Sequence, residues 1–142
     1  MAKKRNVIIE TGKDGFWGFL EHDGGADRIC INSYGKTVSK CMDDFLVAYN
    51  DVKEFTAERG EGIPDMELNF IYDVGAFFNY YPLNVSAFAK YIGMNPSLMR
   101  QYASGVKEPR EKNLARIREG IGTLMSEVVS GHLIEKPVLQ YV

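Results

Sequence analysis

The sequence predicts an α+β protein in which a β-β-β-α-β unit is followed by an all-α unit. Two observations support this class: the spacing of apolar residues changes along the chain, and the composition changes near residues 73–84. Short β-branched and aromatic runs separated by glycine-rich turns open the first half, which is typical of strands. Apolar residues at helical spacing fill the second half. The 142 residues, 45% hydrophobic and 25% charged, suit one globular domain or two small ones.

Three strands are expected near the N-terminus. Residues 6–11 and 16–21 flank the glycine-bounded turn 12–15, and this arrangement predicts a β-hairpin. Residues 28–32 alternate polar and apolar side chains, which predicts a third strand with one solvated face. Residues 33–36 then look like a turn.

The predicted hairpin carries aromatic side chains on both faces of its second strand. Trp17 and Phe19 alternate with Phe16 and Leu20, so one pair is expected to point away from the core. An exposed aromatic pair marks a surface for a partner protein, whereas core packing is the commoner fate of such rings. Trp17 and Phe19 are therefore our candidates for partner binding.

A long amphipathic helix is expected from residue 37 to about residue 58. Apolar residues recur there at i, i+3, i+4 and i+7 spacing, acidic residues fall largely between them, and Thr37 is a suitable N-cap. Residues 66–72 alternate again and predict a fourth strand. A single helix would then cover one face of a small sheet.

Capping residues mark the helices of the second half. Asp73 and Asn84 can cap helices over 74–80 and 85–92, and Asn95 can cap a third that begins at Pro96. A final helix is expected from about residue 111 to residue 130, ended by Gly131. We therefore predict two domains, 1–72 and 73–142, with residues 132–142 as a docking, dimer-forming or frayed tail.

Several classes of protein are excluded by composition. No apolar run approaches the ~18–20 residues of a membrane helix, and the apolar residues 7–9 are far too few for a secretory signal. Cys30 and Cys41 form no CxxC pattern, and His22 and His132 are distant from both. We therefore expect no metal site, no cofactor and two reduced, mostly buried thiols in a cytoplasmic protein.

The net charge of −2 is the sum of two unlike halves. Residues 1–83 carry 9 Lys+Arg and 14 Asp+Glu, a net −5, whereas residues 84–142 carry 8 and 5, a net +3. An acidic module suited to a basic protein partner is thus joined to a modestly basic module suited to DNA. Because +3 is weak for a DNA binder, we expect dimerisation to double the phosphate contacts.

Residues 84–105 predict two short helices that meet at a tight turn. Ala89 is small where the helices would cross, and Gly93 tolerates the positive φ that the turn needs. The expected shared core consists of Phe88, Ile92, Met99 and Tyr102. The outer face of the second helix then carries polar side chains that can hydrogen-bond base edges and phosphates, namely Ser97, Arg100, Gln101 and Ser104.

The pattern of Ala89, Gly93, Met99 and Tyr102, continued by Gly105, Pro109 and an amphipathic helix, resembles a helix-turn-helix of the lambda-repressor/Cro type. The resemblance extends from residue 83 to about residue 124. The resemblance implies that the second helix enters the major groove, where Ser97, Arg100 and Gln101 would contact bases. The implied phosphate contacts are Asn84, Lys90, Lys107 and Arg110. Pro96 departs from the family by standing where many members have a base-contacting polar residue. The alternative is an αα-hairpin used only for packing.

The first half carries a second resemblance. A hairpin built on Lys13-Asp14-Gly15-Phe16-Trp17, followed by a strand, a long helix and a strand and joined to a helix-turn-helix, resembles the HicB antitoxin family. That resemblance implies a truncated RNase H-like N-terminal domain, which binds a small RNA-cleaving toxin, and a C-terminal domain that binds DNA. Residues 23–30 depart from the Leu-Pro-Gly-Cys-type segment of typical members.

Three functions stay open at this point. The leading one is a DNA-binding antitoxin and autorepressor that binds a palindromic operator as a homodimer or higher homo-oligomer. The second is a stand-alone transcriptional regulator whose N-terminal half dimerises or binds a ligand. The third, a metal-dependent nuclease, needs acids that converge on two metal ions. Its candidates are Glu10, Glu21, Asp43 and Asp44, and because these look like surface charges we expect no catalytic residue and no enzyme.

Overall fold

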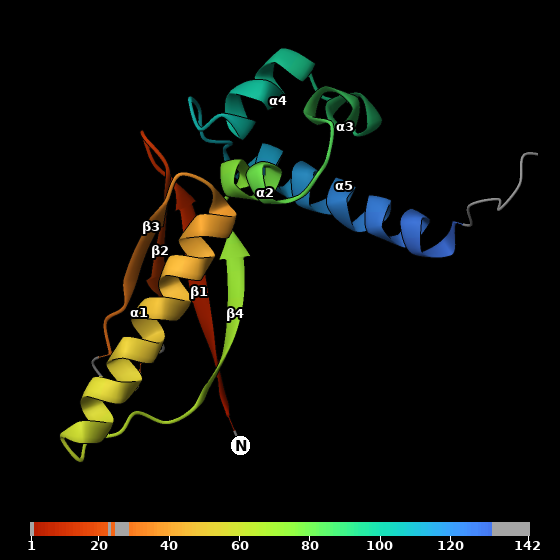
Figure 1. Cartoon of the computed structure of the whole chain (residues 1–142). Helices are drawn as coiled ribbons and strands as arrows, with labels where there is room; N and C mark the ends of the chain where they lie inside the picture. The colour runs from red at the N-terminus through yellow and green to blue at the C-terminus, as the bar shows by residue number, and fades with distance from the viewer. Residues whose placement is uncertain (1, 23, 25–28, 132–142) are drawn as a thin grey trace, which may run out of the picture.

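The computed structural model describes residues 2–22, 24 and 29–131 (Figure 1). The elements of this part of the chain are β1 (Lys3–Thr11), β2 (Phe16–Leu20), β3 (Asn32–Gly35), α1 (Val38–Glu58), β4 (Met66–Tyr72), α2 (Val74–Tyr80), α3 (Val85–Tyr91), α4 (Pro96–Ala103) and α5 (Glu111–Ser130). The predicted α+β class and element order are confirmed. The tail 132–142, whose role the sequence left open, lies outside the described residues.

The four strands form one mixed sheet in the order β3-β2-β1-β4. β2 runs antiparallel to both β1 and β3, whereas β1 and β4 are parallel. A parallel pair needs a crossover connection, which α1 supplies. In Figure 1, α1 lies across one face of the sheet, and the remaining helices gather beyond the end where β1 and β4 finish.

The first core lies between α1 and this sheet. The helical spacing seen in the sequence brings four α1 side chains to the sheet, where Val38, Cys41, Phe45 and Tyr49 are buried. Alternate strand residues meet them, because successive side chains of a strand point to opposite faces. The buried strand residues include Val7, Ile9, Phe16 and Leu20. Thr37 caps α1 as predicted, since its Oγ1 accepts a hydrogen bond from the Lys40 amide at 3.2 Å.

The position of the third strand was predicted wrongly. Residues 29–31 form no strand, and β3 lies at Asn32–Gly35, so it keeps only Asn32 of the predicted strand and takes its other residues from the expected turn. Its residues pair with β2, with Gly35 opposite Phe16 and Asn32 opposite Phe19. Asparagine and glycine are both depleted in strands. Pairing with β2 and packing under α1 therefore decide this strand, and local sequence does not.

Glycine lets α1 approach β3 very closely. A Cβ added at Gly35 would overlap the backbone nitrogen of Cys41 and lie 2.7 Å from the carbonyl carbon of Lys40. A Cβ at Gly18 would lie 2.5 Å from Ser33 Oγ and 3.2 Å from Cys41 Sγ. Small residues on β2 and β3 are thus the reason that the helix can rest directly on this edge of the sheet.

The two cysteines differ, and the expectation of two mostly buried thiols is wrong for Cys30. Cys30 is exposed, whereas Cys41 is fully buried, with its Sγ 3.4 Å from Ser33 Oγ. Burial raises the pKa of the Cys41 thiol, so at neutral pH it is both protonated and shielded.

We expect a maleimide at neutral pH to label Cys30 rapidly and Cys41 only after unfolding, because the thiolate is the reacting form. Intact-mass spectrometry would show one adduct on the native protein and two in denaturant. The Cys30→Ser variant should take up no adduct while folded. Rapid labelling of that variant would contradict the burial of Cys41.

Helix α2 belongs to both cores. Ala76 packs in the first core, whereas Val74 and Phe78 pack in a second core with residues of α3, α4 and α5, namely Phe88, Ala89, Met99, Tyr102 and Ile117. Asp73 Oδ1 accepts hydrogen bonds from the Ala76 amide at 2.8 Å and from Thr11 Oγ1 at 2.7 Å, and its Oδ2 accepts one from the Thr11 amide at 2.7 Å. The predicted domain boundary after residue 72 therefore falls where hydrogen bonds between Thr11 and Asp73 join the two predicted domains.

None of the helices in the described ranges combines the length and the hydropathy that a membrane crossing requires.

Candidate nucleic-acid interface

Asparagine side chains begin both helices of the predicted helix-turn-helix. Asn84 Oδ1 accepts a hydrogen bond from the Ala87 amide at 2.9 Å, and Asn95 Oδ1 accepts from the amides of Ser97 and Leu98 at 2.8 and 3.2 Å. Pro96 occupies the first turn of α4, where its missing N–H is not needed. Local sequence is thus sufficient to begin these helices, as predicted.

The turn between α3 and α4 has the expected geometry. Gly93 adopts a φ of +74°, and the Met94 amide donates a hydrogen bond to the Ala89 carbonyl at 2.8 Å. Three of the four predicted core residues, Phe88, Met99 and Tyr102, are buried and Ile92 is half-buried. Ala89 is fully buried at the helix crossing, as its size predicted.

Two side chains of α5, which no sequence pattern indicated, bond to the helix-turn-helix, one at the turn and one at α4. Arg116 donates hydrogen bonds to the carbonyls of Ile92 and Gly93 at 3.2 and 3.1 Å. Asn113 Nδ2 donates to the Tyr102 hydroxyl at 3.0 Å. No local pattern could reveal these partners, because they lie more than ten residues away in the sequence and meet only when α5 packs against α3 and α4.

The outer face of α4 carries the predicted base-contacting residues. Ser97, Arg100 and Gln101 are all exposed, as is Ser104 at the C-cap of α4, and spacings of three and four residues place these side chains next to one another. One guanidinium nitrogen of Arg100 donates to Ser86 Oγ of α3 at 2.8 Å. This bond orients the guanidinium and leaves its other N–H donors available.

The predicted phosphate-binding residues surround this face unevenly. Lys90 is exposed one helical turn after Ser86, and the amide of Lys107 donates to the Gln101 carbonyl at 3.3 Å, so both lie beside α4. Asn84 is exposed at the start of α3. Arg110 is exposed at the N-cap of α5, where its side chain makes no capping hydrogen bond.

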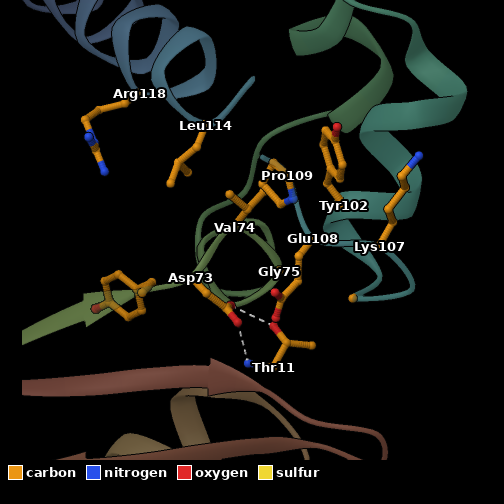
Figure 2. Close-up of a pocket in the computed structure, with 12 residues that line it drawn as sticks. Thr11, Asp73, Val74, Gly75, Tyr102, Lys107, Glu108, Pro109, Leu114 and Arg118 are labelled. Carbon is orange, nitrogen blue, oxygen red and sulfur yellow. Dashed lines mark hydrogen bonds between the residues drawn. The ribbon is translucent and has the colours of Figure 1, made fainter. Parts of the chain in front are cut away.

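Behind α4, a cavity of about 300 Å³ lies beside the contact between the sheet and the helical half. Figure 2 shows Thr11, Asp73 and Gly75 on one side of it and Leu114 and Arg118 of α5 on the other. Tyr72 also lines it, and burial together with the neighbouring Tyr81 and Tyr80 raises the pKa of Tyr72 to about 12. This phenol therefore stays protonated in the physiological range.

The predicted partner-binding residues lie on the sheet face opposite α1. Trp17 is 54% exposed and Phe19 is half-buried, whereas Phe16 and Leu20 point to the core. The Trp17 ring lies 4.7 Å from the Tyr34 ring, centroid to centroid. By strand register, Ile8 and Ile71 extend this face. Which hairpin face is exposed could not be predicted, because it depends on the side that α1 covers.

The four acidic residues considered for a nuclease do not converge. Glu10 of β1 pairs with Trp17, whereas Glu21 lies beside Asn6 of the same strand. Asn6 and Glu10 are four residues apart, which is about 13 Å along β1. On α1, Asp43 is exposed and Asp44 Oδ2 accepts a hydrogen bond from the Tyr34 amide at 3.0 Å. Within the described ranges, no group of three or more His, Cys, Asp or Glu side chains is placed to hold a metal ion.

Comparisons of the chain with protein-family models, with curated proteins and with solved structures returned no match.

Proposed function

We propose that the protein is a DNA-binding antitoxin and transcriptional autorepressor. The observation that carries this proposal is the α4 face, where exposed Ser97, Arg100 and Gln101 stand on a short helix held by α3 and α5. A short, rigidly positioned helix with such side chains suits the major groove, which is wide enough for an α-helix. The modest +3 charge of residues 84–142 supports the same partner.

In this proposal Arg100 pairs with a guanine and Gln101 with an adenine, since these are the bidentate pairs that their side chains favour. Lys90, Lys107, Asn84 and Arg110 contact phosphates, which position the protein without reading sequence. A palindromic operator would be bound by two copies, with half-sites about 34 Å apart.

The N-terminal half would bind a small basic toxin. Its net charge of −5 over residues 1–83 supports a basic partner. The exposed ring of Trp17, with Phe19 beside it, offers an apolar surface of the kind found at protein interfaces.

A stand-alone regulator with an N-terminal ligand module is the second candidate. The cavity of about 300 Å³ between the halves is the observation that favours it. A basic protein encoded next to this chain that co-purifies with it would support the antitoxin, and the absence of such a gene would support the regulator.

We expect Arg100→Ala and Gln101→Ala each to weaken binding to a selected operator duplex by about 5- to 150-fold, because a bidentate base contact contributes about 1–3 kcal/mol. Fluorescence anisotropy at two salt concentrations would measure this. Arg59→Ala is the matched control, since Arg59 is exposed at the end of α1 that lies far from α4 (Figure 1). If both α4 variants bind as tightly as the control, α4 is not the recognition helix.

A further inference from the structure

The last turns of α5 expose an apolar face that nothing in the described part of the chain covers. Met125, Val128 and Val129 are 60%, 66% and 78% exposed. Figure 1 shows this end of α5 projecting beyond α2 and α3. Only one of residues 121–130 is charged, Glu127. An exposed helix end normally carries a charged face, so this composition indicates a surface that is buried in an assembly.

A groove lies on the same side of the helix, closer to the body of the protein. It has a volume of about 140 Å³ and lies between α2 and α5, lined in part by Phe77, Leu114 and Ile121. Leu114, Ile121 and Val128 are spaced seven residues apart, which is about two helical turns, so they form one stripe along α5. Each copy of the chain therefore carries both an apolar ridge and a mostly apolar groove, which Asp73 and Arg118 also line.

We propose that the α5 end of one copy docks in the groove of a second copy. The two α5 helices would run antiparallel about a two-fold axis at Ile121. Val128 and Leu114 lie equally far from that axis, about 10 Å on either side, so Val128 of each copy meets the groove beside Leu114 of the other. The contact is isologous, because one surface serves both copies.

The charges around this stripe favour a second copy over other occupants. Residues 121–130 contain no Lys or Arg, and Arg118 is the one cation among the residues that line the groove, whereas helices that bind anionic membranes or nucleic acid carry several cations beside their apolar face. Glu127 lies on the other side of the helix and lines the hollow next to Tyr91 of α3. The two Glu127 carboxylates would therefore not meet at the proposed axis.

The exposed sheet face is a poorer site for self-association. By strand register, Glu10, Glu21 and Glu67 lie around its aromatic centre, with Lys4 as the neighbouring cation. Stacking two such faces would bring like charges together, which destabilises an interface. Between the sheet and α5, the structure thus favours α5 for pairing between copies and leaves the acidic sheet face for a different partner.

The experiment is light scattering on the full chain in the absence of DNA. The monomer has a mass of 16.0 kDa, so the parent should elute as a dimer of about 32 kDa. The Met125→Glu/Val128→Glu variant should be monomeric, with dimerisation weakened by about 100-fold or more, because it would bury unpaired carboxylates. Both positions are exposed in a single copy, so the variant should keep its helical circular dichroism.

Ser126→Glu/Ser130→Glu is the matched control, since it adds the same two charges to exposed positions of the same helix away from the stripe. This control should remain dimeric. A monomeric parent, an unchanged dimer mass for the Met125→Glu/Val128→Glu variant, or equal dissociation of the control would each overturn the proposal. Operator binding as proposed above needs this dimer, but loss of operator binding with an intact dimer would count against the proposed function alone.

Discussion

Replacing Gly35 with alanine is expected to lower the free energy of unfolding by about 3 kcal/mol, the upper range for an overpacked core. The added methyl group would overlap the backbone of α1 at Cys41, and no rotamer change can relieve a clash with backbone. Helix and sheet would have to separate at β3, where Ser33 and Cys41 are buried. Guanidinium denaturation followed by circular dichroism would measure the loss.

Gly62→Ala is the matched control, because a Cβ added at Gly62 would meet nothing within 4 Å. That variant should differ from the parent by no more than about 0.5 kcal/mol, as is usual for surface substitutions. Equal stability of the two variants would mean that α1 does not approach β3 as closely as described.

Asp73→Ala should cost about 3 kcal/mol, because it removes a helix cap and both hydrogen bonds to Thr11. These bonds tie the end of β1 to the start of α2, and Figure 2 shows them beside the cavity between the halves. Their loss should also speed hydrogen exchange at the Thr11 and Ala76 amides. Denaturation and hydrogen-exchange mass spectrometry would report the two effects separately.

Asn84→Ala is the matched control for this second substitution. It removes a cap of the same kind, the hydrogen bond from the Ala87 amide in α3, without removing the Thr11 bonds, so it should cost only about 1 kcal/mol. If the two alanine variants are equally stable, the link between Thr11 and Asp73 contributes nothing to joining the halves.

The link through Asp73 bears on how the two proposed activities are related. α2 contributes buried side chains to both cores, and its residue Asn79 accepts a hydrogen bond from the Val38 amide at 2.9 Å. A partner on the sheet and DNA on α4 would therefore bind to one continuously packed body. The two proposed sites lie on different elements of it, so both could be occupied together.

Local signals were enough to predict most of the elements. Thr37, Asp73, Asn84 and Asn95 all cap the helices that they were expected to cap, because an N-cap depends on a side chain and the amides two or three residues later. The positive φ of Gly93 and the burial of Ala89 followed in the same way from a turn and a helix crossing encoded within a few residues.

Longer-range features could not be predicted. β3 has no apolar pattern of its own, and its place follows from pairing with β2 and from glycine packing under α1. The exposure of Cys30 was also missed, since its expected burial came from the usual behaviour of free thiols and not from any local pattern.

By itself, then, the sequence determined the α+β class, the order of the elements, the helix starts and the polar face of α4, all of which depend on short-range periodicity and capping. Only the tertiary structure decided which hairpin face is exposed, where β3 lies, how Arg116 holds the turn and that the end of α5 is uncovered. Those features depend on contacts between residues far apart in the chain, and a periodic pattern carries no information about which distant surface it will meet.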